Sequence, residues 1–410
     1  MKRRVVVTGM GGICPLGSDW PSVRKKLRDG TSGVTTVPEW SACAGLESRL
    51  AAKADFTVPA DWTRQQIRTM GRVSLMAAYA TERALDDARL SDHPSLTNGA
   101  CGVAYGSTAG SPPAVEEYFR RLYMERNLKG LSPYTYIQLM SHTCAANLSQ
   151  FFKVKGRVIP TCSACTSGSQ GVGYAYESIK TGQQDVMIAG GAEELHLAAT
   201  VVFDVMYATS KRNDDPTSAP SPFDRDRDGL VIGEGAGTLI LEDLDHAKKR
   251  GAPIHAEVVG FGTNSDGAHM INPSTQGMEE AMRLALRDSA LSASEIGYVN
   301  AHGTATELGD IAESHATARL FGKRMPFSSL KSYMGHTLGA CGALEAWMSI
   351  AMMNEGWFAP TINLKNVDKR CGRLDYIRKK PRDLNVKYVM SNNFAFGGVN
   401  TSLIFRKWSR

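Results

Sequence analysis

Residues 158–173 read VIPTCSACTSGSQGVG, and the rest of the chain is organised around this stretch. It begins at the end of an apolar run, continues with small and polar residues, and after Thr166 shows apolar side chains at helical spacing. We therefore expect Cys165 at a tight turn from a strand into a helix. The free N–H groups of a helix N-terminus favour a thiolate, lower the pKa of a thiol and can receive an oxyanion, so this position suits a nucleophile.

Cys162 and Cys165 also form a C-x-x-C pair, which has other interpretations. A redox pair usually opens a helix in a small thioredoxin-like unit, and no such unit surrounds this pair. A zinc site needs a second pair of ligands, and the sequence contains no other C-x-x-C. Both cysteines can also be ordinary core residues, and for Cys162 we expect packing beneath the turn.

The composition restricts the class of protein. The 410 residues, of which 42% are apolar, can bury a large core in one big domain or two. A net charge of +6 is too small for a nucleic-acid-binding surface and fits an acidic protein partner docking on one face. Eight cysteines without regular spacing are typical of reduced thiols. Since we find neither a secretory signal nor an apolar stretch long enough to span a membrane, we expect a cytoplasmic protein.

Predicted strands and helices alternate along the chain. Buried strands are expected over residues 4–8, 101–107 and 185–192, and a second series begins at Ala256 and Ile296. The second half thus repeats the alternation of strands and helices of the first. This alternation predicts an α/β architecture in which helices cover a sheet.

Three further segments have simple structural interpretations. A long helix is predicted over residues 63–90. Its apolar face would carry Met76, Ala80, Ala84 and Ala88. Residues 213–229 are polar and contain prolines, which indicates a surface loop. Residues 230–242 read as a glycine-rich strand, in which GEGAG favours close backbone packing over phosphate binding.

Two histidines follow the nucleophile candidate. His302 ends a predicted strand in IGYVNAHGTATELGD, and Lys331 and His336 lie in the glycine-rich SSLKSYMGHTLGACGALEAW. A third cluster, SNNFAFGGVNTSLIF, carries a flexible Phe-Ala-Phe-Gly-Gly loop between apolar strands. Taken alone, each histidine is more simply a structural residue. Together with Cys165, they form a set that suits acyl transfer.

The motifs TCSACTSG, VNAHGTAT, SSLKSYMGHTLGA and SNNFAFGGVN occur in this order over the full chain. They resemble the β-ketoacyl-acyl-carrier-protein synthases, condensing enzymes of the thiolase-like fold with a Cys-His-His triad. The resemblance implies an α/β fold of two similar halves in α-β-α-β-α layers, residues 1–243 with the nucleophile and residues 244–410 with both histidines. SACTSGSQ, DGLVIGEGAGTLILE and SNNFAFGGVNTS look most like the ketosynthases of bacterial aryl polyene biosynthesis.

The resemblance implies an acyltransferase, a 3-oxoacyl-[acyl-carrier-protein] synthase. Cys165 would take an acyl group from a carrier protein, and malonyl-carrier protein would then lose carbon dioxide. His302 and His336 would donate hydrogen bonds to the resulting enolate, while Lys331 would orient and tune them. Backbone N–H groups of Cys165 and Phe396 would form the oxyanion hole, and Phe396 would gate the acyl chamber.

The same resemblance implies the substrate contacts. Thr304 and Thr306 would bind the phosphopantetheine arm of the carrier, so the protein itself needs no cofactor. Ala109 stands where fatty-acid enzymes carry a large aliphatic side chain at the acyl pocket. Phe203, with Tyr134 and Tyr136, would line a tunnel for conjugated chains; core or dimer contacts are the simpler interpretation of these aromatics.

Partners follow from the resemblance as well. An acyl carrier protein would dock on Arg64, Arg68 and Arg72. A dimer is expected, either with itself or with a chain-length-factor homologue, through a strand near Asp185. Two other functions remain open: an elongating fatty-acid synthase, or a non-catalytic chain-length partner, which Cys165 argues against.

No metal site is firmly indicated. Four residues match positions that bind a structural monovalent cation in some relatives, and a buried polar network without an ion explains them equally well. These residues are Asn300, Glu345, Ser391 and Asn392.

Overall fold

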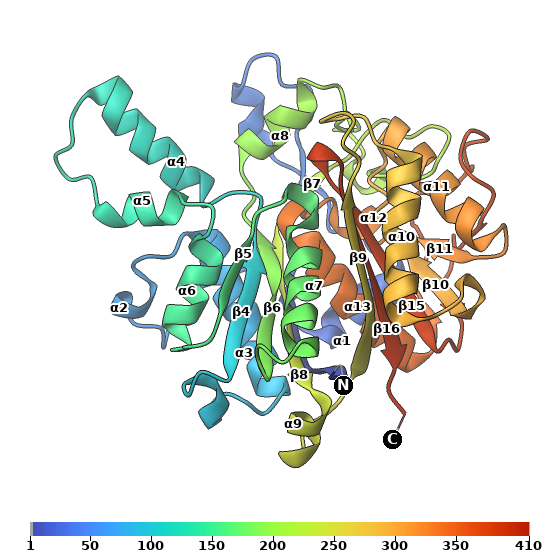
Figure 1. The fold of residues 1–410 in the computed structure, drawn as a ribbon. Coiled ribbons are helices and arrows are strands. Elements are labelled where there is room, and N and C mark those ends of the chain that lie inside the picture. The colour runs from blue at the N-terminus through green and yellow to red at the C-terminus, as the bar shows by residue number, and fades with distance from the viewer. Residues whose placement is uncertain (1–2, 410) are drawn as a thin grey trace.

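Eleven strands form the framework of the protein, in a computed structural model that describes residues 3–409 (Figure 1). Their order in the sheet is β13-β11-β10-β15-β16-β9-β1-β8-β6-β4-β5. The first half of the chain supplies β1 (Val5–Ile13), β4 (Cys101–Gly106), β5 (Val158–Thr161), β6 (Val186–Glu193) and β8 (Gly235–Asp243). The second half supplies β9 (Ala256–Ser265), β10 (Ile296–Asn300), β11 (Pro326–Ser328), β13 (Asp375–Tyr376), β15 (Tyr388–Phe394) and β16 (Val399–Lys407). Within the sheet, the halves meet where β1 and β9 pair over three residues of each strand.

Helices form three layers around the two parts of this sheet. The first half is covered on the outside by α3 (Arg72–Asp87) and α6 (Thr143–Phe151), and the second half by α10 (Thr275–Ser289) and α11 (Glu307–Phe321). Between them lie α7 (Ser167–Lys180) and α13 (Cys341–Glu355), which contact strands of both halves (Figure 1). The layers therefore follow the predicted α-β-α-β-α order of a thiolase-like fold.

Glycine permits the same close packing of helix on strand in both halves. A Cβ atom on Gly9 of β1 would lie 2.1 Å from the carbonyl oxygen of Ala84 in α3. A Cβ atom on Gly260 of β9 would lie 2.4 Å from the carbonyl oxygen of Ala285 in α10. Only glycine allows such an approach. Gly9 in β1 and Gly260 in β9, the first strand of each half, therefore let a helix pack closely on the sheet.

The predicted helix over residues 63–90 is broken into α2 (Arg64–Ile67) and α3. Gly71 is extended and caps α3, and a Cβ atom there would lie 2.4 Å from the Cβ atom of Ser111. The chain turns at this close approach, which the helical pattern did not reveal. The predicted apolar face is confirmed, because all four of its members are fully buried: Met76, Ala80, Ala84 and Ala88.

Two glycine-rich or polar segments also differ from expectation. Residues 213–229 are not only a surface loop, because Phe223 and Asp224 are buried and the side chain of Arg227 is 1% exposed.

Residues 230–242 form two strands, β7 (Ile232–Gly233) and β8, interrupted at Glu234. The interruption lets the buried Glu234 carboxylate bind Arg72 of α3 at 2.7 Å. Close packing at GEGAG is confirmed, since a Cβ on Gly237 would lie 2.7 Å from Leu344 N.

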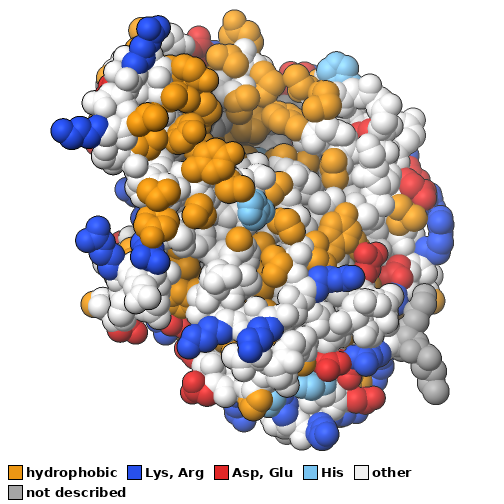
Figure 2. All heavy atoms as spheres, turned by 60° about the vertical axis from the view of Figure 1, so that its left-hand side comes forward, with side chains coloured by type: hydrophobic (Ala, Val, Ile, Leu, Met, Phe, Trp, Pro, Cys, Tyr) orange, Lys and Arg blue, Asp and Glu red, His pale blue; other side chains and the backbone are white. Residues whose placement is uncertain are grey.

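The strand near Asp185 is not an edge. It is β6, which pairs with β8 on one side and β4 on the other. The open edge is β5, where Val158 is 42% exposed. An arm formed by α4 (Pro112–Phe119) and α5 (Pro133–Leu139) projects beside it (Figure 1). Figure 2 shows apolar side chains gathered on one face of the molecule. The exposed apolar residues of the arm are Phe119, Tyr123, Met124, Leu128 and Tyr136.

Short elements complete the chain. Two small sheets are formed by β2 (Thr35–Thr36), β3 (Leu50–Ala52) and β7, and by β12 (Trp357–Phe358) and β14 (Arg382–Asp383). The remaining helices are α1 (Trp20–Asp29), α8 (Leu197–Asp204), α9 (Leu244–Lys249) and α12 (Lys331–Met334). Within residues 3–409, no helix has the length and apolar character needed to cross a membrane.

Candidate active site

Cys165 lies in a short 3₁₀ turn, Ala164–Thr166, between the end of β5 and the start of α7. The predicted strand-to-helix turn is therefore present. Sγ of Cys165 is 2.9 Å from Nε2 of His336. A ring nitrogen of His302 completes the group, so that one atom from each of the three side chains lies within 4.8 Å of the others. All three residues are buried.

The thiol of Cys165 does not have the lowered pKa expected at a helix start. Burial raises its pKa to about 12, and the opposing effect of the Lys331 cation is smaller. Cys165 is thus a thiol at rest, and it must lose its proton during acyl transfer. The N-terminus of α7 does not outweigh the removal of Cys165 from water.

His336 is held as a neutral ring with a defined tautomer. Its Nδ1 atom accepts the backbone N–H of Leu338 at 3.3 Å. The proton of the neutral ring then belongs on Nε2, the atom that faces Cys165. Burial, and then the Lys331 cation, hold the pKa of His336 well below its usual range. His336 is therefore a hydrogen-bond donor toward the cavity.

His302 is held by the helix that follows it. Its backbone N–H and that of Gly303 each donate to a carboxylate oxygen of Glu313 at 2.7 Å. Burial, followed by Lys331 and His336, lowers the pKa of His302 well below its usual range. The ring stands nearly perpendicular to that of His336, with 5.1 Å between centroids. Nδ1 of His302 is buried without a hydrogen-bond partner among residues 3–409.

Lys331 and Glu345 form a buried ion pair next to the triad. Nζ of Lys331 lies 2.5 Å from Oε1 of Glu345, and neither side chain is exposed. Burial alone would lower the pKa of Lys331, but the Glu345 carboxylate outweighs it and raises that pKa. Lys331 is therefore a fixed cation that disfavours a second positive charge on either histidine.

Three of the four candidate cation ligands, Asn300, Ser391 and Glu345, lie in a buried polar network beside Lys331. The side chain of Asn392 points to the other face of β15, where it donates to Met282 Sδ of α10. Asn300 donates to Ser391 Oγ at 3.2 Å, and Asn392 accepts from Ser402 at 2.7 Å. Oδ1 of Asn300 is buried without a partner in the described part of the chain. That unpaired oxygen, beside the Glu345 carboxylate, is compatible with a hard monovalent cation.

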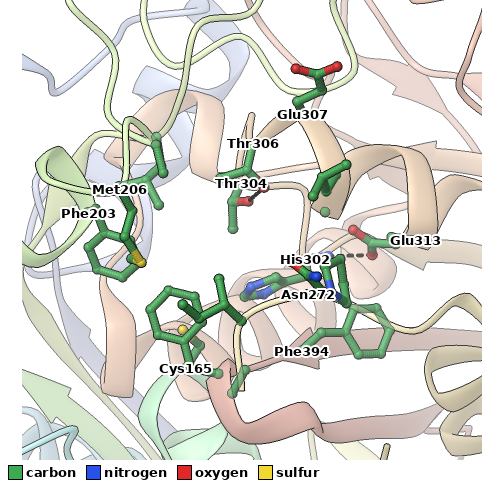
Figure 3. Close-up of a pocket in the computed structure, with 18 of the residues that line it drawn as sticks. Cys165, Phe203, Met206, Asn272, His302, Thr304, Thr306, Glu307, Glu313 and Phe394 are labelled. Carbon is green, nitrogen blue, oxygen red and sulfur yellow. Dashed lines mark hydrogen bonds between the residues drawn. The ribbon is translucent and has the colours of Figure 1, made fainter. Parts of the chain in front are cut away.

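A cavity of about 350 Å³ leads from the surface to Cys165 (Figure 3). Phe203, Thr304, Thr306 and Phe396 all line it, as the sequence predicted. The two threonine hydroxyls are 2.9 Å apart and face the space between the mouth and the triad. Phe203 and Phe396 stack with 5.2 Å between their centroids, close to Cys165.

Ala109 does not belong to this cavity. It is exposed, in the loop after β4, and does not line the space that reaches Cys165. Tyr136, 51% exposed on α5, and Tyr134 are likewise absent from the lining. Ala109 therefore lines no part of the cavity that reaches Cys165 in the single chain, and its place in an acyl pocket wall stays a prediction.

Two other expectations need correction. Cys162 is exposed, not packed beneath the turn, and its thiol donates to the carbonyl oxygen of Ser141 at 2.8 Å. Arg72 does not share a solvated stripe with Arg64 and Arg68, because it turns inward to the buried Glu234. Only Arg64 and Arg68 remain exposed.

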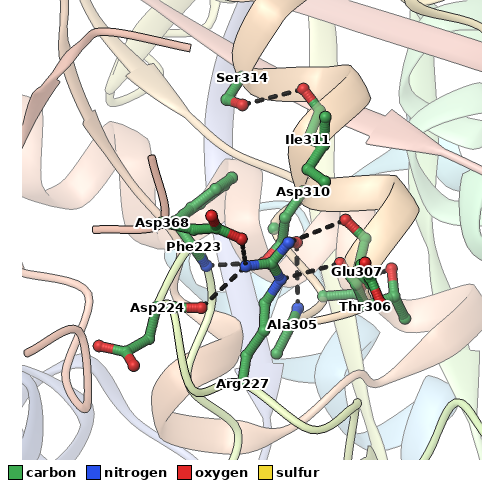
Figure 4. A network of polar contacts seen from close by, with 12 residues as sticks. Phe223, Asp224, Arg227, Ala305, Thr306, Glu307, Asp310, Ile311, Ser314 and Asp368 are labelled. Carbon is green, nitrogen blue, oxygen red and sulfur yellow. Dashed lines mark hydrogen bonds and ion pairs between the residues drawn. The ribbon is translucent and has the colours of Figure 1, made fainter. Parts of the chain in front are cut away.

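Sequence reasoning missed a buried ion network at the mouth of the cavity (Figure 4). Arg227 contacts Asp310 at 3.4 Å and Asp368 at 2.7 Å, and it donates to the carbonyl oxygens of Thr306 and Glu307. Asp310 in turn accepts the backbone N–H of Ala305 at 3.1 Å. This network fixes the segment that carries both threonines. No local pattern signals this network, because Arg227 and Asp368 are 141 positions apart in the chain.

Comparisons with known proteins agree with this geometry. The family model "Beta-ketoacyl synthase, N-terminal domain" matches residues 2–247, and "Beta-ketoacyl synthase, C-terminal domain" matches residues 255–365. The chain is 36% identical over 407 residues to "3-oxoacyl-[acyl-carrier-protein] synthase 1" of Escherichia coli K12, covering 99% of both chains.

Solved structures show the same relationship. A β-ketoacyl synthase from Burkholderia phymatum STM815 is 56% identical and superimposes with a TM-score of 0.98 over 100% of both chains. The ishigamide ketosynthase/chain length factor is 30% identical, with a TM-score of 0.90 over 100% of both chains. The chain therefore belongs to the β-ketoacyl synthase family and is an acyltransferase of the thiolase-like fold.

Proposed function

We propose that this protein performs a decarboxylative Claisen condensation on Cys165. It would join a malonyl unit, carried by an acyl carrier protein, to an acyl group held as a thioester. The observation that carries the proposal is the convergence of Cys165, His302 and His336 within 4.8 Å at the inner end of a cavity.

The first step would load the acyl group. The Cys165 sulfur attacks the acyl thioester, the carrier thiol leaves, and the thiol proton moves to the departing sulfur. Backbone N–H groups of Cys165 and Phe396 would stabilise the oxyanion of the tetrahedral intermediate. Because burial raises the pKa of Cys165, deprotonation and attack are expected to be coupled.

The second step would generate the carbon nucleophile. The bond to the malonyl carboxylate breaks, carbon dioxide leaves, and the electron pair moves toward the thioester oxygen. His336, whose Nε2 carries its proton, and His302 would donate hydrogen bonds to that enolate oxygen. The enolate carbon then attacks the thioester on Cys165, forms the new carbon–carbon bond and expels the cysteine sulfur, which regains a proton.

Carrier recognition would use the cavity and its surroundings. Thr304 and Thr306 line the cavity at a depth suited to the amide groups of a phosphopantetheine arm. The arm belongs to the carrier, so the enzyme would bring no cofactor of its own. Arg64 and Arg68 are the remaining candidates for docking an acidic carrier. A monovalent cation at Asn300 and Glu345 would have a structural role only.

A dimer would complete the enzyme. The open edge of β5 and the apolar arm lie on one face, and a surface of that kind usually marks an association site (Figure 2). The partner would be a second copy or a chain-length-factor homologue, as the solved ishigamide complex suggests by its two named components. We place the enzyme in the cytoplasm.

For the acyl chain, we propose an aryl polyene precursor, based on the similarity of SACTSGSQ, DGLVIGEGAGTLILE and SNNFAFGGVNTS. The stacked Phe203 and Phe396 beside Cys165 offer flat surfaces for a conjugated chain. A fatty-acid elongating synthase is the second candidate, because the Escherichia coli relative has that type of name.

One experiment separates these candidates. The enzyme is incubated with aryl-acyl and saturated acyl carrier proteins in competition, plus malonyl-carrier protein, and the products are identified by mass. Extension of the aryl-acyl carrier in preference supports the proposal, and extension of the saturated chain alone favours the fatty-acid enzyme. No condensation with any acyl carrier would leave only the non-catalytic chain-length role.

A further inference from the structure

Glu193 is a buried carboxylate next to the triad that the proposed chemistry does not use. It ends β6 and is 3% exposed. Its Oε2 atom accepts three hydrogen bonds, from Thr108 N at 3.1 Å, Thr108 Oγ1 at 2.5 Å and Gly339 N at 2.9 Å. Thr108 belongs to the first half of the chain and Gly339 to the second. One oxygen therefore connects the two halves.

Gly339, one of the two residues that donate to Glu193, lies in the turn that follows His336. Gly339 is in the 3₁₀ turn Leu338–Ala340, and the preceding N–H, that of Leu338, donates to Nδ1 of His336. Glu193 thus binds the peptide unit next to the one that sets the tautomer of the ring. Displacing this turn would turn Nε2 away from Cys165.

The turn needs an external restraint. Leu338 has a φ of +44°, a conformation that is unfavourable for a non-glycine residue and persists only when the surroundings enforce it. Gly339 packs so closely that a Cβ atom would lie 2.8 Å from Thr108 N. The backbone of His336 itself is tied to the first half by its N–H to Val231 O at 2.7 Å. Glu193 supplies the second tie, on the other side of the ring.

We propose that Glu193 is a positioning residue for His336, which holds the Leu338–Ala340 turn against the first half of the chain so that Nε2 points at the reacting oxygen. This inference rests on the proposed role of His336 in decarboxylation. Glu193 touches no substrate, and it acts only through the histidine. Its removal should therefore slow the step that needs His336 and spare the step that needs only backbone N–H groups.

The test measures two steps separately, malonyl decarboxylation and single-turnover acylation of Cys165, in Glu193→Ala, Glu193→Gln and Glu193→Asp. A displacement of about 1 Å costs about 10²-fold in rate, and we expect a loss of this size in decarboxylation for Glu193→Ala. Acylation should change little. Glu193→Gln keeps an acceptor oxygen at the same distance and should retain most of the rate, whereas Glu193→Asp keeps the charge but cannot reach both partners and should resemble Glu193→Ala.

A matched control is the neighbouring Glu194. It is also buried, but its carboxylate accepts from Val73 N at 3.1 Å and Ser111 Oγ at 2.9 Å, away from the triad. Glu194→Gln should leave decarboxylation unchanged. A loss in Glu194→Gln as large as that in Glu193→Ala would show a general effect of changing a buried carboxylate and would overturn the inference. Should Glu193→Ala not fold, Glu193→Asp and Glu193→Gln carry the same comparison.

Double-mutant cycles give the decisive readout. In a His336→Ala background, Glu193→Ala should cause little further loss, because the histidine through which it acts is gone. In a His302→Ala background, it should cause its full loss. Full additivity with His336→Ala contradicts the proposed positioning role. If His336→Ala alone leaves decarboxylation unchanged, the proposed function of the histidine is wrong, which is a different result.

Discussion

The ammonium group of Lys331 lies 2.5 Å from Oε1 of Glu345, and both side chains are fully buried. Burial and the Lys331 cation together hold the pKa of His302 and His336 well below the usual range. Both rings therefore stay neutral as the pH falls, and neutral rings are the form proposed to donate to the enolate.

Lys331→Met should narrow the pH range of decarboxylation on its acid side. Without the cation, the pKa of both histidines rises, so protonation begins at a higher pH and the acid limb of the rate profile moves upward. Lys331→Arg is the control, since it retains a cation at this position and should not move that limb upward. The measurement is the rate of carbon dioxide release against pH, and an unmoved acid limb in Lys331→Met would contradict the assigned role.

The two cysteines of the C-x-x-C should have unequal importance. Cys165→Ala should abolish acyl transfer, because only Cys165 lies at the inner end of the cavity and beside His336. Cys162→Ala should keep most of the activity, because Cys162 is exposed and its thiol donates to the Ser141 carbonyl. Intact-protein mass after incubation with an acyl carrier shows which variant is loaded. Equal loss in both variants, or zinc in the purified protein, would restore the C-x-x-C interpretation.

The histidines should affect one step far more than the other. His302→Ala and His336→Ala should each slow malonyl decarboxylation by about 10²–10³-fold, the usual effect of removing one oxyanion donor. Acylation of Cys165 should survive better, because backbone N–H groups serve that step. If neither substitution slows carbon dioxide release, the enolate assignment fails.

Arg227 should contribute to stability through its contact with the buried carboxylate of Asp310. Arg227→Gln leaves Asp310 without its buried cationic partner, and breaking a buried pair in this way costs about 3–5 kcal/mol. The free energy of unfolding, measured with urea, should fall accordingly. Arg370→Gln is the control, because Arg370 binds Asp368 from a side chain that is 55% exposed, and it should cost less than about 1 kcal/mol. Equal effects of the two variants would contradict the importance of burial.

Short motifs allowed the triad to be predicted, because each of its residues lies in a local pattern of strand, turn and helix. Cys165, His302 and His336 are brought together by the fold as expected. Glu193 could not be found in this way, since its partners Thr108 and Gly339 are 85 and 146 positions away in the chain. Long-range hydrogen bonds leave no periodic pattern in a sequence.

The residues that lie elsewhere than the sequence suggested share a physical reason. Composition and spacing predict which residues are buried in an element, but not the direction in which a loop leaves it. Ala109 and Cys162 both lie just beyond the carboxyl ends of neighbouring parallel strands, β4 and β5, and both are exposed. The assignment of the sheet edge to the strand near Asp185 failed similarly, because strand order depends on pairing partners far away in the chain.

The exposed face that carries β5 and the arm leads to the last prediction. Met124 is 82% exposed and Tyr123 is 65% exposed, in a segment that projects away from the core. Apolar groups in such positions stabilise an assembly by their removal from water. We therefore expect light scattering at micromolar concentration to show a dimer, either of this chain alone or with its chain-length partner.

Met124→Asp should weaken the dimer, since burial of an unpaired carboxylate is unfavourable. Met270→Asp is the matched control, because Met270 is 70% exposed but lies at the mouth of the cavity, and it should leave the association unchanged. A monomer in the unmodified protein, with and without a chain-length partner, or an equal effect of both substitutions, would show that the arm is not the interface.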